Sequence, residues 1–373
     1  MDKHLHIVCL DIPWPADYGG VVDLFYKIQS LHQQGVKIHL HCFTKYRKPQ
    51  DELNKYCESV TYYYRKKNSS SLSFSIPLIV NSRANDALLT NLLKDNYPIL
   101  LEGIHCTYFL HSGQLNNRKV VVRLHNAEFE YYKQLAKQET NLFKKLYFLY
   151  ESRLLKKYEK SIAHKTTFLA VSKQDVALYK QELGATDIHY LPVFLPYTQV
   201  NAHEGKGCFC LYHGNLAINE NEEAAIWLLK NVFNKVELPF VIAGKNPSQK
   251  LQHLAHEKQH TCLVVNPSHK EMQDMIAKAH VHVLPSLNNT GIKLKLLNAL
   301  FNGRHCIANK ASADGSGLEA FCHIANDAVS FQKKITTLYQ QPFEEKEILQ
   351  RQALLAATYN NEANARELMT FLW

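Results

Sequence analysis

Short apolar runs alternate along the chain with longer segments in which apolar residues recur every three or four positions. A short continuous apolar run is typical of a strand buried on both faces of a parallel sheet, and the wider spacing is typical of an amphipathic helix. The first such pair is HLHIVCLDI at 4–12 and VVDLFYKIQSLHQQG at 21–35. The pattern therefore predicts an α/β protein made of strand–helix–strand units.

An irregular segment near the middle of the chain separates two series of these units. From Pro192 to Gly207 the sequence has two prolines, two glycines and no apolar periodicity, and FCLYHG at 209–214 then restarts the pattern. A chain of 373 residues suits two domains of ordinary size. We predict that residues 1–195 and 196–373 each form a Rossmann-like domain with a parallel sheet.

A strand, a loop and an amphipathic helix follow one another without a gap in LPSLNNTGIKLKLLNALFNG at 284–303. The apolar spacing predicts a helix that begins near Gly291 and ends at Gly303. Its predicted buried face carries Ile292, Leu296, Ala299 and Leu300, whereas Gly291, Lys295 and Asn298 lie on another face. A helix N-terminus favours phosphate, and Lys293 and Lys295 add positive charge beside it. The segment is therefore a candidate phosphate site.

A second polar cluster follows the strand predicted at 119–126. This strand delivers Arg123, His125 and Asn126 to its carboxyl end, and Glu128 comes directly after them. Ligands of open α/β sheets bind outside the carboxyl ends of the strands. We therefore interpret these four residues as candidates for a functional site in the first domain.

The 284–303 segment resembles the nucleotide-sugar motif of the retaining glycosyltransferases of family 4, which have the GT-B fold. Pro285, Ser286, Gly291, Leu294, Ala299 and Gly303 are in register with that motif, and Thr290 and Asn298 stand where it has two glutamates. Three other segments also resemble family loops. They contain Gly20 in the first glycine turn, Gly214 with Asn215 in the loop that opens the second domain, and Lys245 in AGKNP. Asn215 and Glu220 replace an arginine and a lysine of the family pattern.

The resemblance implies two Rossmann-like domains facing a cleft, with the C-terminal helix crossing back onto the first domain. It implies that residues 1–195 take the acceptor and 196–373 the nucleotide-sugar. His125 would be the catalytic residue, and Arg123, Asn126 and Glu128 the acceptor-side candidates. The donor-binding candidates would be Gly20, Gly214, Asn215, Lys245, Thr290, Gly291, Lys293, Lys295 and Asn298.

The activity that the resemblance implies is that of a hexosyltransferase-type enzyme of polysaccharide biosynthesis. It would move a sugar, with retention, from a nucleotide-sugar donor to a glycan or lipid-linked glycan. The sequence has no Asp-x-Asp, the motif with which glycosyltransferases of the other main fold hold a metal, so we expect a metal-independent reaction without a cofactor. Two alternatives stay open, a sugar-nucleotide epimerase and a catalytically weak binding or partner protein that has lost the motif glutamates.

Charge and cysteine content limit the partners and the compartment. The net charge is +9, and residues 1–200 carry +8 of it. In the long helix predicted at 141–165, lysines crowd one side, and the other side would face a core through Leu142, Leu146, Leu149, Leu155 and Tyr158. This helix favours contact with an anionic membrane surface over nucleic acid, whose typical binding motifs are missing from the sequence.

Nine scattered cysteines without CxxC or zinc-site spacing predict no metal and a reducing compartment. We expect a cytoplasmic protein, peripheral on the inner membrane face.

Overall fold

The computed structural model describes residues 2–16, 19–66, 73–314 and 316–373, and the chain divides into two compact units. Unit 1 comprises Met1–Pro196 and Tyr359–Trp373, and unit 2 comprises Tyr197–Thr358. Each unit is built around one sheet in which neighbouring strands run parallel. The prediction of two Rossmann-like α/β units is confirmed.

The sheet of unit 1 has seven strands in the order β3-β2-β1-β4-β5-β6-β7. Successive side chains of β5 enter different hydrophobic clusters, because Val121 packs with Leu24 and Ile28 whereas Val122 packs with Leu155. The sheet is therefore buried on both faces, which explains the continuous apolar runs. The strands are β1 His4–Cys9, β2 Lys37–Thr44, β3 Ser59–Tyr64, β4 Ile99–Glu102, β5 Val120–Leu124, β6 Thr167–Ala170 and β7 Ile188–Tyr190.

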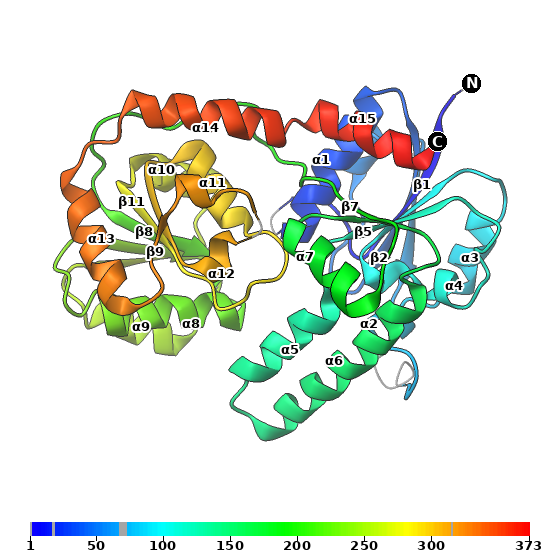
Figure 1. Cartoon of the computed structure of the whole chain (residues 1–373), viewed down its shortest axis with the longest axis horizontal. Helices are drawn as coiled ribbons and strands as arrows, with labels where there is room; N and C mark the ends of the chain where they lie inside the picture. Colours follow the sequence, from blue (N-terminus) through cyan, green and yellow to red (C-terminus); the bar gives the residue numbers. More distant parts are fainter. Residues whose placement is uncertain (1, 17–18, 67–72, 315) are drawn as a thin grey trace. The chain divides into compact units, whose positions relative to one another are not determined.

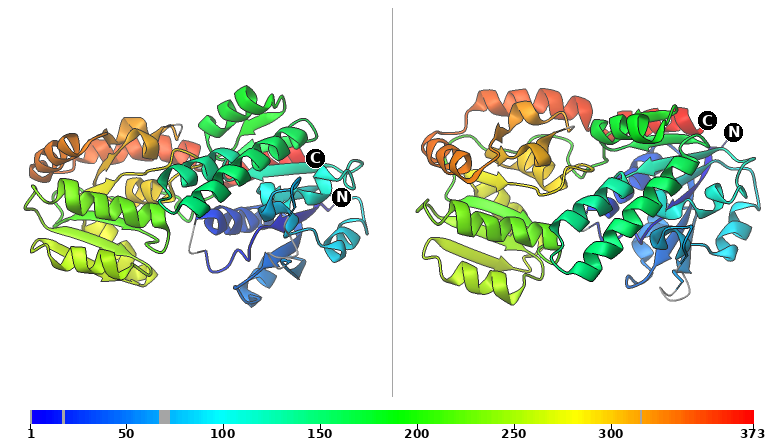
Figure 2. Two further views of the ribbon diagram at one scale, coloured as in Figure 1. Left: turned by 90° about the horizontal axis from the view of Figure 1, so that it is seen from below. Right: turned by 60° about the horizontal axis from the view of Figure 1, so that its bottom comes forward.

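The helices of unit 1 include one from the very end of the chain. Helix α15 lies beside α1 (Figures 1 and 2) and packs Leu368 and Leu372 into the cluster that contains Leu24 of α1. Lys3 Nζ lies 5.1 Å from the ring centre of Trp373, at the end of the chain. The return of the C-terminal helix to the first unit is thus confirmed. The helices are α1 Gly19–Gln33, α2 Leu78–Asn81, α3 Asp86–Leu92, α4 Tyr108–His111, α5 Glu128–Gln138, α6 Leu142–Ile162, α7 Lys173–Leu178 and α15 Asn361–Leu372.

Helices α5 and α6 form a hairpin that extends away from the sheet of its unit (Figure 1). Leu155 and Tyr158 of α6 are buried as expected, but Leu142 and Leu146 are 65% and 55% exposed. The prediction that these two leucines face a core was wrong, because the first turns of α6 extend past the layer that packs on the sheet. Within the described ranges, no helix is long and apolar enough to span a bilayer.

Unit 2 has a six-stranded sheet in the order β10-β9-β8-β11-β12-β13. Its strands are β8 Cys210–Gly214, β9 Phe240–Gly244, β10 Thr261–Val265, β11 Val281–Leu284, β12 His305–Ala308 and β13 His323–Ile324. Its helices are α8 Asn219–Trp227, α9 Gln249–His256, α10 His269–Lys278, α11 Leu294–Asn302, α12 Lys310–Ala313, α13 Ala328–Gln340 and α14 Glu345–Thr358. A Cβ on Gly244 would lie 2.1 Å from the carbonyl oxygen of Gly214, so β8 and β9 approach too closely there for any larger residue.

Helix α11 begins three residues later than the sequence suggested. Gly291 has φ of 62°, a left-handed conformation that a right-handed helix cannot include, and Lys293 is the N-cap. Ile292 consequently lies outside the helix, whereas Leu296, Ala299 and Leu300 form its buried face as predicted. The helix ends before Gly303, also as predicted.

A ladder of hydrogen-bonded histidines joins β1 to β2. His6 Nδ1 lies 2.9 Å from His41 Nε2, His41 Nδ1 lies 2.9 Å from the Tyr63 hydroxyl, and His6 Nε2 lies 3.0 Å from Asp95 Oδ1. Burial and, to a smaller extent, the neighbouring His6 and His39 lower the pKa of His41 to about 3. His41 therefore stays neutral in the folded protein over the whole physiological range.

The neutral state of His41 predicts a specific loss of stability in acid. Below pH of about 6.5 the unfolded chain binds a proton at this position that the folded chain does not, so folding stability falls as the pH drops. One such histidine lowers the free energy of unfolding by up to about 1.4 kcal/mol for each pH unit below 6.5. Urea unfolding of His41→Gln should depend less steeply on pH between 6.5 and 4.5 than that of the wild type. His260→Gln, at an exposed site, should keep the wild-type slope, and equal slopes for all three proteins would contradict the assignment.

Candidate functional site

The candidate residues of unit 2 gather at one edge of its sheet. Strands β8 and β11 are neighbours. Gly214 ends β8 and Asn215 begins the loop after it, and the loop after β11 carries Thr290 with Gly291. Because parallel strands end at the same edge, both loops lie where ligands of open α/β sheets bind. Lys245 lies directly after β9, the other neighbour of β8, and its side chain is exposed at this edge.

Lys295 connects helix α11 to the loop after β8. Its Nζ donates to the Tyr212 hydroxyl at 3.2 Å and to Asn221 Oδ1 at 3.0 Å. The Asn221 amide in turn donates to the carbonyl oxygen of Asn215 at 3.0 Å. Burial lowers the pKa of Lys295 to about 8, because the negative charge of Glu220 offsets only part of the desolvation and Lys293 adds repulsion. Lys295 is therefore a fixed cation that loses its charge slightly above neutral pH.

Thr290 is buried inside the loop and shapes it. Its backbone N–H and its hydroxyl donate to Asn288 Oδ1 at 2.8 and 2.9 Å, and its carbonyl oxygen accepts from Lys293 Nζ at 2.9 Å. The hydroxyl of Ser286 donates to Glu220 Oε1 at 2.8 Å. Glu220, which stands where the family pattern has a lysine, is thus part of the loop structure.

Asn298 is half-buried on the first half of α11, and its side chain already has a partner. Its Oδ1 accepts from the Asn302 amide at 2.8 Å, so a ribose hydroxyl would have to share that oxygen. The structure therefore brings Gly214, Asn215, Lys293 and Lys295 together, and it leaves Asn298 beside them with part of its hydrogen-bonding capacity in use.

Arg123 of unit 1 has a structural role. Its side chain is fully buried, and it donates to Asp23 Oδ1 at 3.0 Å and to the carbonyl oxygens of Leu191 at 2.6 Å and Pro192 at 2.9 Å. The interpretation of Arg123 as an acceptor-side residue was wrong, because the side chain points into the interior of the unit rather than to the end of β5. Sequence pattern does not reveal this direction.

His125 belongs to a buried group of charges around Asp23. His125 Nε2 lies 3.0 Å from Glu102 Oε2, the other oxygen of Glu102 lies 2.8 Å from Lys27 Nζ, and Lys27 Nζ also lies 3.0 Å from Asp23 Oδ2. With Arg123, the group contains two carboxylates and two permanent cations. His125 keeps 13% of its side chain exposed, whereas Glu102 is fully buried.

The two carboxylates of this group remain ionised. Burial opposes the charge of Asp23, but Arg123 and Lys27 outweigh this effect and lower its pKa; Lys27 and His125 do the same for the pKa of Glu102. Asp23, Lys27 and Glu102 were not among the predicted site residues. The available signal was the presence of charged residues at apolar-spaced positions, with Asp23 and Lys27 four residues apart in α1 and Glu102 ending the apolar run ILLE.

Glu128, in the first turn of α5, is a buried carboxyl group. Burial, with a smaller contribution from Asp175, raises its pKa to about 7, although a hydrogen bond with Asn126 offsets part of the increase. Glu128 can therefore accept or release a proton near neutral pH. The structure places Asn126 and Glu128 together, as the sequence suggested.

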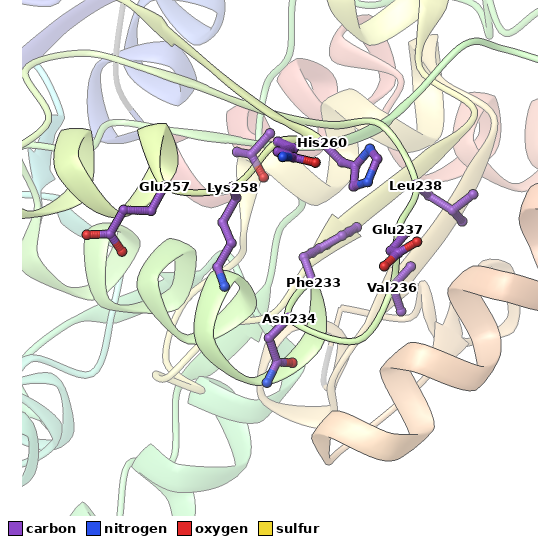
Figure 3. A pocket seen from close by; sticks show the side chains of 10 residues that line it. Phe233, Asn234, Val236, Glu237, Leu238, Glu257, Lys258 and His260 are labelled. Carbon is purple, nitrogen blue, oxygen red and sulfur yellow. The ribbon is translucent and has the colours of Figure 1, made fainter.

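A pocket of about 180 Å³ lies elsewhere in unit 2 (Figure 3). It is lined by Phe233, Val236, Lys258 and Thr261, among others, beside the N-terminal ends of β9 and β10. This edge of the sheet is opposite to the one that carries the candidate loops, and the pocket contains none of the candidate residues.

The chain is similar in sequence to a glycosyltransferase family and to a bacterial protein. Residues 208–341 match the family model described as Glycosyl transferases group 1. A relative from Klebsiella pneumoniae, described as an uncharacterized 44.6 kDa protein in the cps region, is 29% identical over 354 residues, which cover 88% of this chain and 89% of the relative.

Two solved structures share the fold over nearly their whole length. Sucrose-phosphate synthase from Thermosynechococcus elongatus superposes with a TM-score of 0.72 at 14% identity, with 99% of this chain and 98% of that chain covered. Staphylococcus aureus TarM, solved with UDP, superposes with a TM-score of 0.66 at 10% identity, with 99% of each chain covered. The two Rossmann-like units and the match over 208–341 identify the chain as a protein of the GT-B fold that resembles the group 1 glycosyltransferases.

Proposed function

We propose that this protein is a retaining, metal-independent glycosyltransferase that moves a hexose from a nucleotide-sugar to a glycan or lipid-linked glycan. The observation that carries the proposal is the Lys295 network, which fixes a cation beside the start of α11 and the loop after β8. The same residues fall inside the segment that matches the group 1 family model. A helix start with two lysines suits a diphosphate.

The donor diphosphate would bind between the loop after β8 and the start of α11. Lys293 and Lys295 would stabilise the negative charge that develops on the leaving nucleoside diphosphate, and Gly214, Asn215, Gly291 and Lys245 would complete the site. Fixed cations serve this purpose well because they need no reorganisation during the reaction.

In unit 1 we propose that His125 acts at the donor sugar and that Asn126 and Glu128 act on the acceptor. Glu102 holds the imidazole of His125 through a 3.0 Å contact, so it is a positioning residue. Glu128, whose pKa is about 7, is suited to exchange a proton with an acceptor hydroxyl at neutral pH.

The exposed side chains at the tip of the α5–α6 hairpin favour the proposal that the acceptor is lipid-linked and lies at a membrane surface. Phe143 is 83% exposed beside the exposed Leu142 and Leu146, and the exposed Lys144 and Lys145 come between them. Apolar side chains next to lysines are the combination with which peripheral proteins bind anionic bilayers. The cps region named for the Klebsiella relative agrees with a role in polysaccharide synthesis. We propose peripheral attachment to the inner membrane face.

The donor site predicts binding of a nucleoside diphosphate. Calorimetry at pH 7 with UDP, GDP, ADP and CDP should detect at least one ligand, and Lys295→Ala should weaken it by roughly 10–150-fold, as loss of a charge-assisted hydrogen bond of about 1.5–3 kcal/mol implies. The affinity of the wild type for the nucleoside diphosphate should fall as the pH rises through about 8, because Lys295 of the ligand-free protein loses its proton there. Lys295→Arg should remove this pH dependence.

Lys250→Ala, at an exposed lysine of α9, is the matched control and should bind like the wild type. Asn298→Glu should tighten binding by about tenfold or less, because a charged acceptor makes a stronger hydrogen bond to ribose than a neutral one. If the wild type binds none of the four nucleotides, the donor-site proposal fails, and a binding or partner protein becomes the better account.

His125→Ala should abolish sugar transfer and leave nucleoside diphosphate affinity nearly unchanged, because the substitution removes a group that acts on the sugar. Transfer is measured as sugar incorporation and affinity by calorimetry. His189→Ala, at a histidine of unit 1 that is 47% exposed, should retain activity. Normal transfer by His125→Ala would refute the catalytic role, and a large decrease in Tm without loss of specific activity would identify His125 as a structural residue.

The hairpin tip predicts binding to anionic vesicles. The protein should sediment with phosphatidylglycerol-containing vesicles at low salt, less at physiological salt because charge interactions are then screened, and not with neutral vesicles. Phe143→Ser should weaken binding by about tenfold or more, since insertion of such a side chain contributes about 1.5–3 kcal/mol. Leu349→Ser, at an exposed leucine of α14, is the control. Equal sedimentation with both vesicle types would contradict the proposal.

A further inference from the structure

Three side chains of unit 2 that are far apart in the sequence converge at one point. His305 begins β12, His323 begins β13, and Glu347 lies in the first turn of α14. One potential ligand atom from each of the three lies within 4.8 Å of the other two. No part of the proposed transfer reaction uses them, because the donor loops lie at the carboxyl ends of the strands, whereas His305 opens its strand.

The surroundings of His305 fix which of its nitrogens carries the proton. Nε2 lies 3.1 Å from the carbonyl oxygen of Gln341, which can only accept, so Nε2 carries the hydrogen. Nδ1 then has a lone pair, and among the described residues nothing donates to it although the residue is only 3% exposed. A buried acceptor without a partner is costly, so Nδ1 is the nitrogen of His305 that is available to bind a ligand.

The neighbouring His280, unlike His305, has a hydrogen-bond partner on each ring nitrogen. Its Nδ1 accepts from the backbone N–H of Gly207 at 3.0 Å, and its Nε2 lies 2.9 Å from the Gln341 carbonyl oxygen. Both histidines thus donate to the same carbonyl group, but only His305 lacks a partner on its other nitrogen. The missing partner is therefore specific to Nδ1 of His305.

We propose that His305, His323 and Glu347 bind a divalent transition-metal ion, with Zn²⁺ as the best match. Two imidazoles and one carboxylate are an established zinc ligand set, and water would complete the tetrahedron. The bond from His305 Nε2–H to a backbone carbonyl is the interaction by which metal-binding histidines are usually held in the correct tautomer.

The ligands need only a small closure around the ion. Zinc bonds of about 2.0–2.2 Å place tetrahedral ligands roughly 3.3–3.6 Å apart. His305 is fixed in the sheet, whereas His323 and Glu347 are half-buried and can adjust. Lys334 and Arg351 both act electrostatically on His323, and Arg351 donates to the carbonyl oxygens of Gly303 at 2.9 Å and Arg304 at 2.7 Å, so it is held by the backbone. The charges of these two cations oppose the ion, and we expect weaker binding than at a cysteine-rich structural site.

The second group with metal-ligand spacing is Asp23, Glu102 and His125. Its two carboxylates already neutralise Lys27 and Arg123, so an added ion would face two permanent cations at short range. The cluster at His305 has one carboxylate, which Arg351 partly compensates, and an unpaired lone pair on His305 Nδ1. An ion there would attach α14 to the short edge strand β13 and to β12, and it would stabilise unit 2 without entering the transfer reaction.

The test uses the full-length reduced protein titrated with CoCl₂ and ZnCl₂. Cobalt should give the visible spectrum of a nitrogen and oxygen site, and calorimetry should show one zinc ion per chain. His323→Gln and Glu347→Gln should each weaken zinc binding by more than about tenfold, since loss of even an outer partner of a metal ligand costs about 10–100-fold. Saturating zinc should raise the Tm of the wild type but not of these variants.

His269→Gln, at an exposed histidine of α10 in the same unit, should bind zinc like the wild type. A thiolate-to-cobalt charge-transfer band would overturn the proposal, because Cys306 and Cys322 are adjacent to the two histidines in sequence and would then be the ligands. Binding that is unchanged in both His323→Gln and Glu347→Gln, or no binding by the wild type, would also overturn it.

Discussion

The buried carboxylate of Asp23 joins three separate segments of unit 1. It accepts from Arg123 at the end of β5, from Lys27 one turn further along α1, and from the backbone N–H of Phe194 in the segment that leaves the sheet. Loss of one partner in such a buried charge group costs about 3–5 kcal/mol, because the remaining charges are then uncompensated. The position of α1, the path of the chain after β7 and the orientation of His125 are therefore coupled through one side chain.

The two candidate sites follow the same design. In unit 1, Glu102 fixes His125, and in unit 2, Asn221 and Tyr212 fix Lys295. Each functional side chain is held by a buried polar partner from a different element of its own unit. Such partners limit the rotamers of a side chain before any ligand binds, which is the preorganisation that electrostatic catalysis requires.

Apolar periodicity was sufficient to predict the parallel sheets, the two units and the end of α11 at Gly303, because these features follow from which side chains are buried. It failed where backbone conformation or side-chain direction decided the outcome. Gly291 adopts a left-handed φ, so α11 starts later than predicted. The side chain of Arg123 in β5 points into the interior of unit 1 because Asp23 of α1 lies there and accepts its hydrogen bond. Asp23 and Arg123 are 100 residues apart. Pairing over such a distance cannot be read from local pattern, and the same is true of His305, His323 and Glu347.

The packing of α15 on α1 sets an order for folding during synthesis. Leu24 and Ile28 of α1 share their hydrophobic cluster with Leu368 and Leu372, so the first unit made by the ribosome lacks part of its core until the last residues emerge. Unit 2 has no such dependence, since its residues are contiguous in the chain. The core of unit 1 is therefore completed only after the whole of unit 2 has been translated.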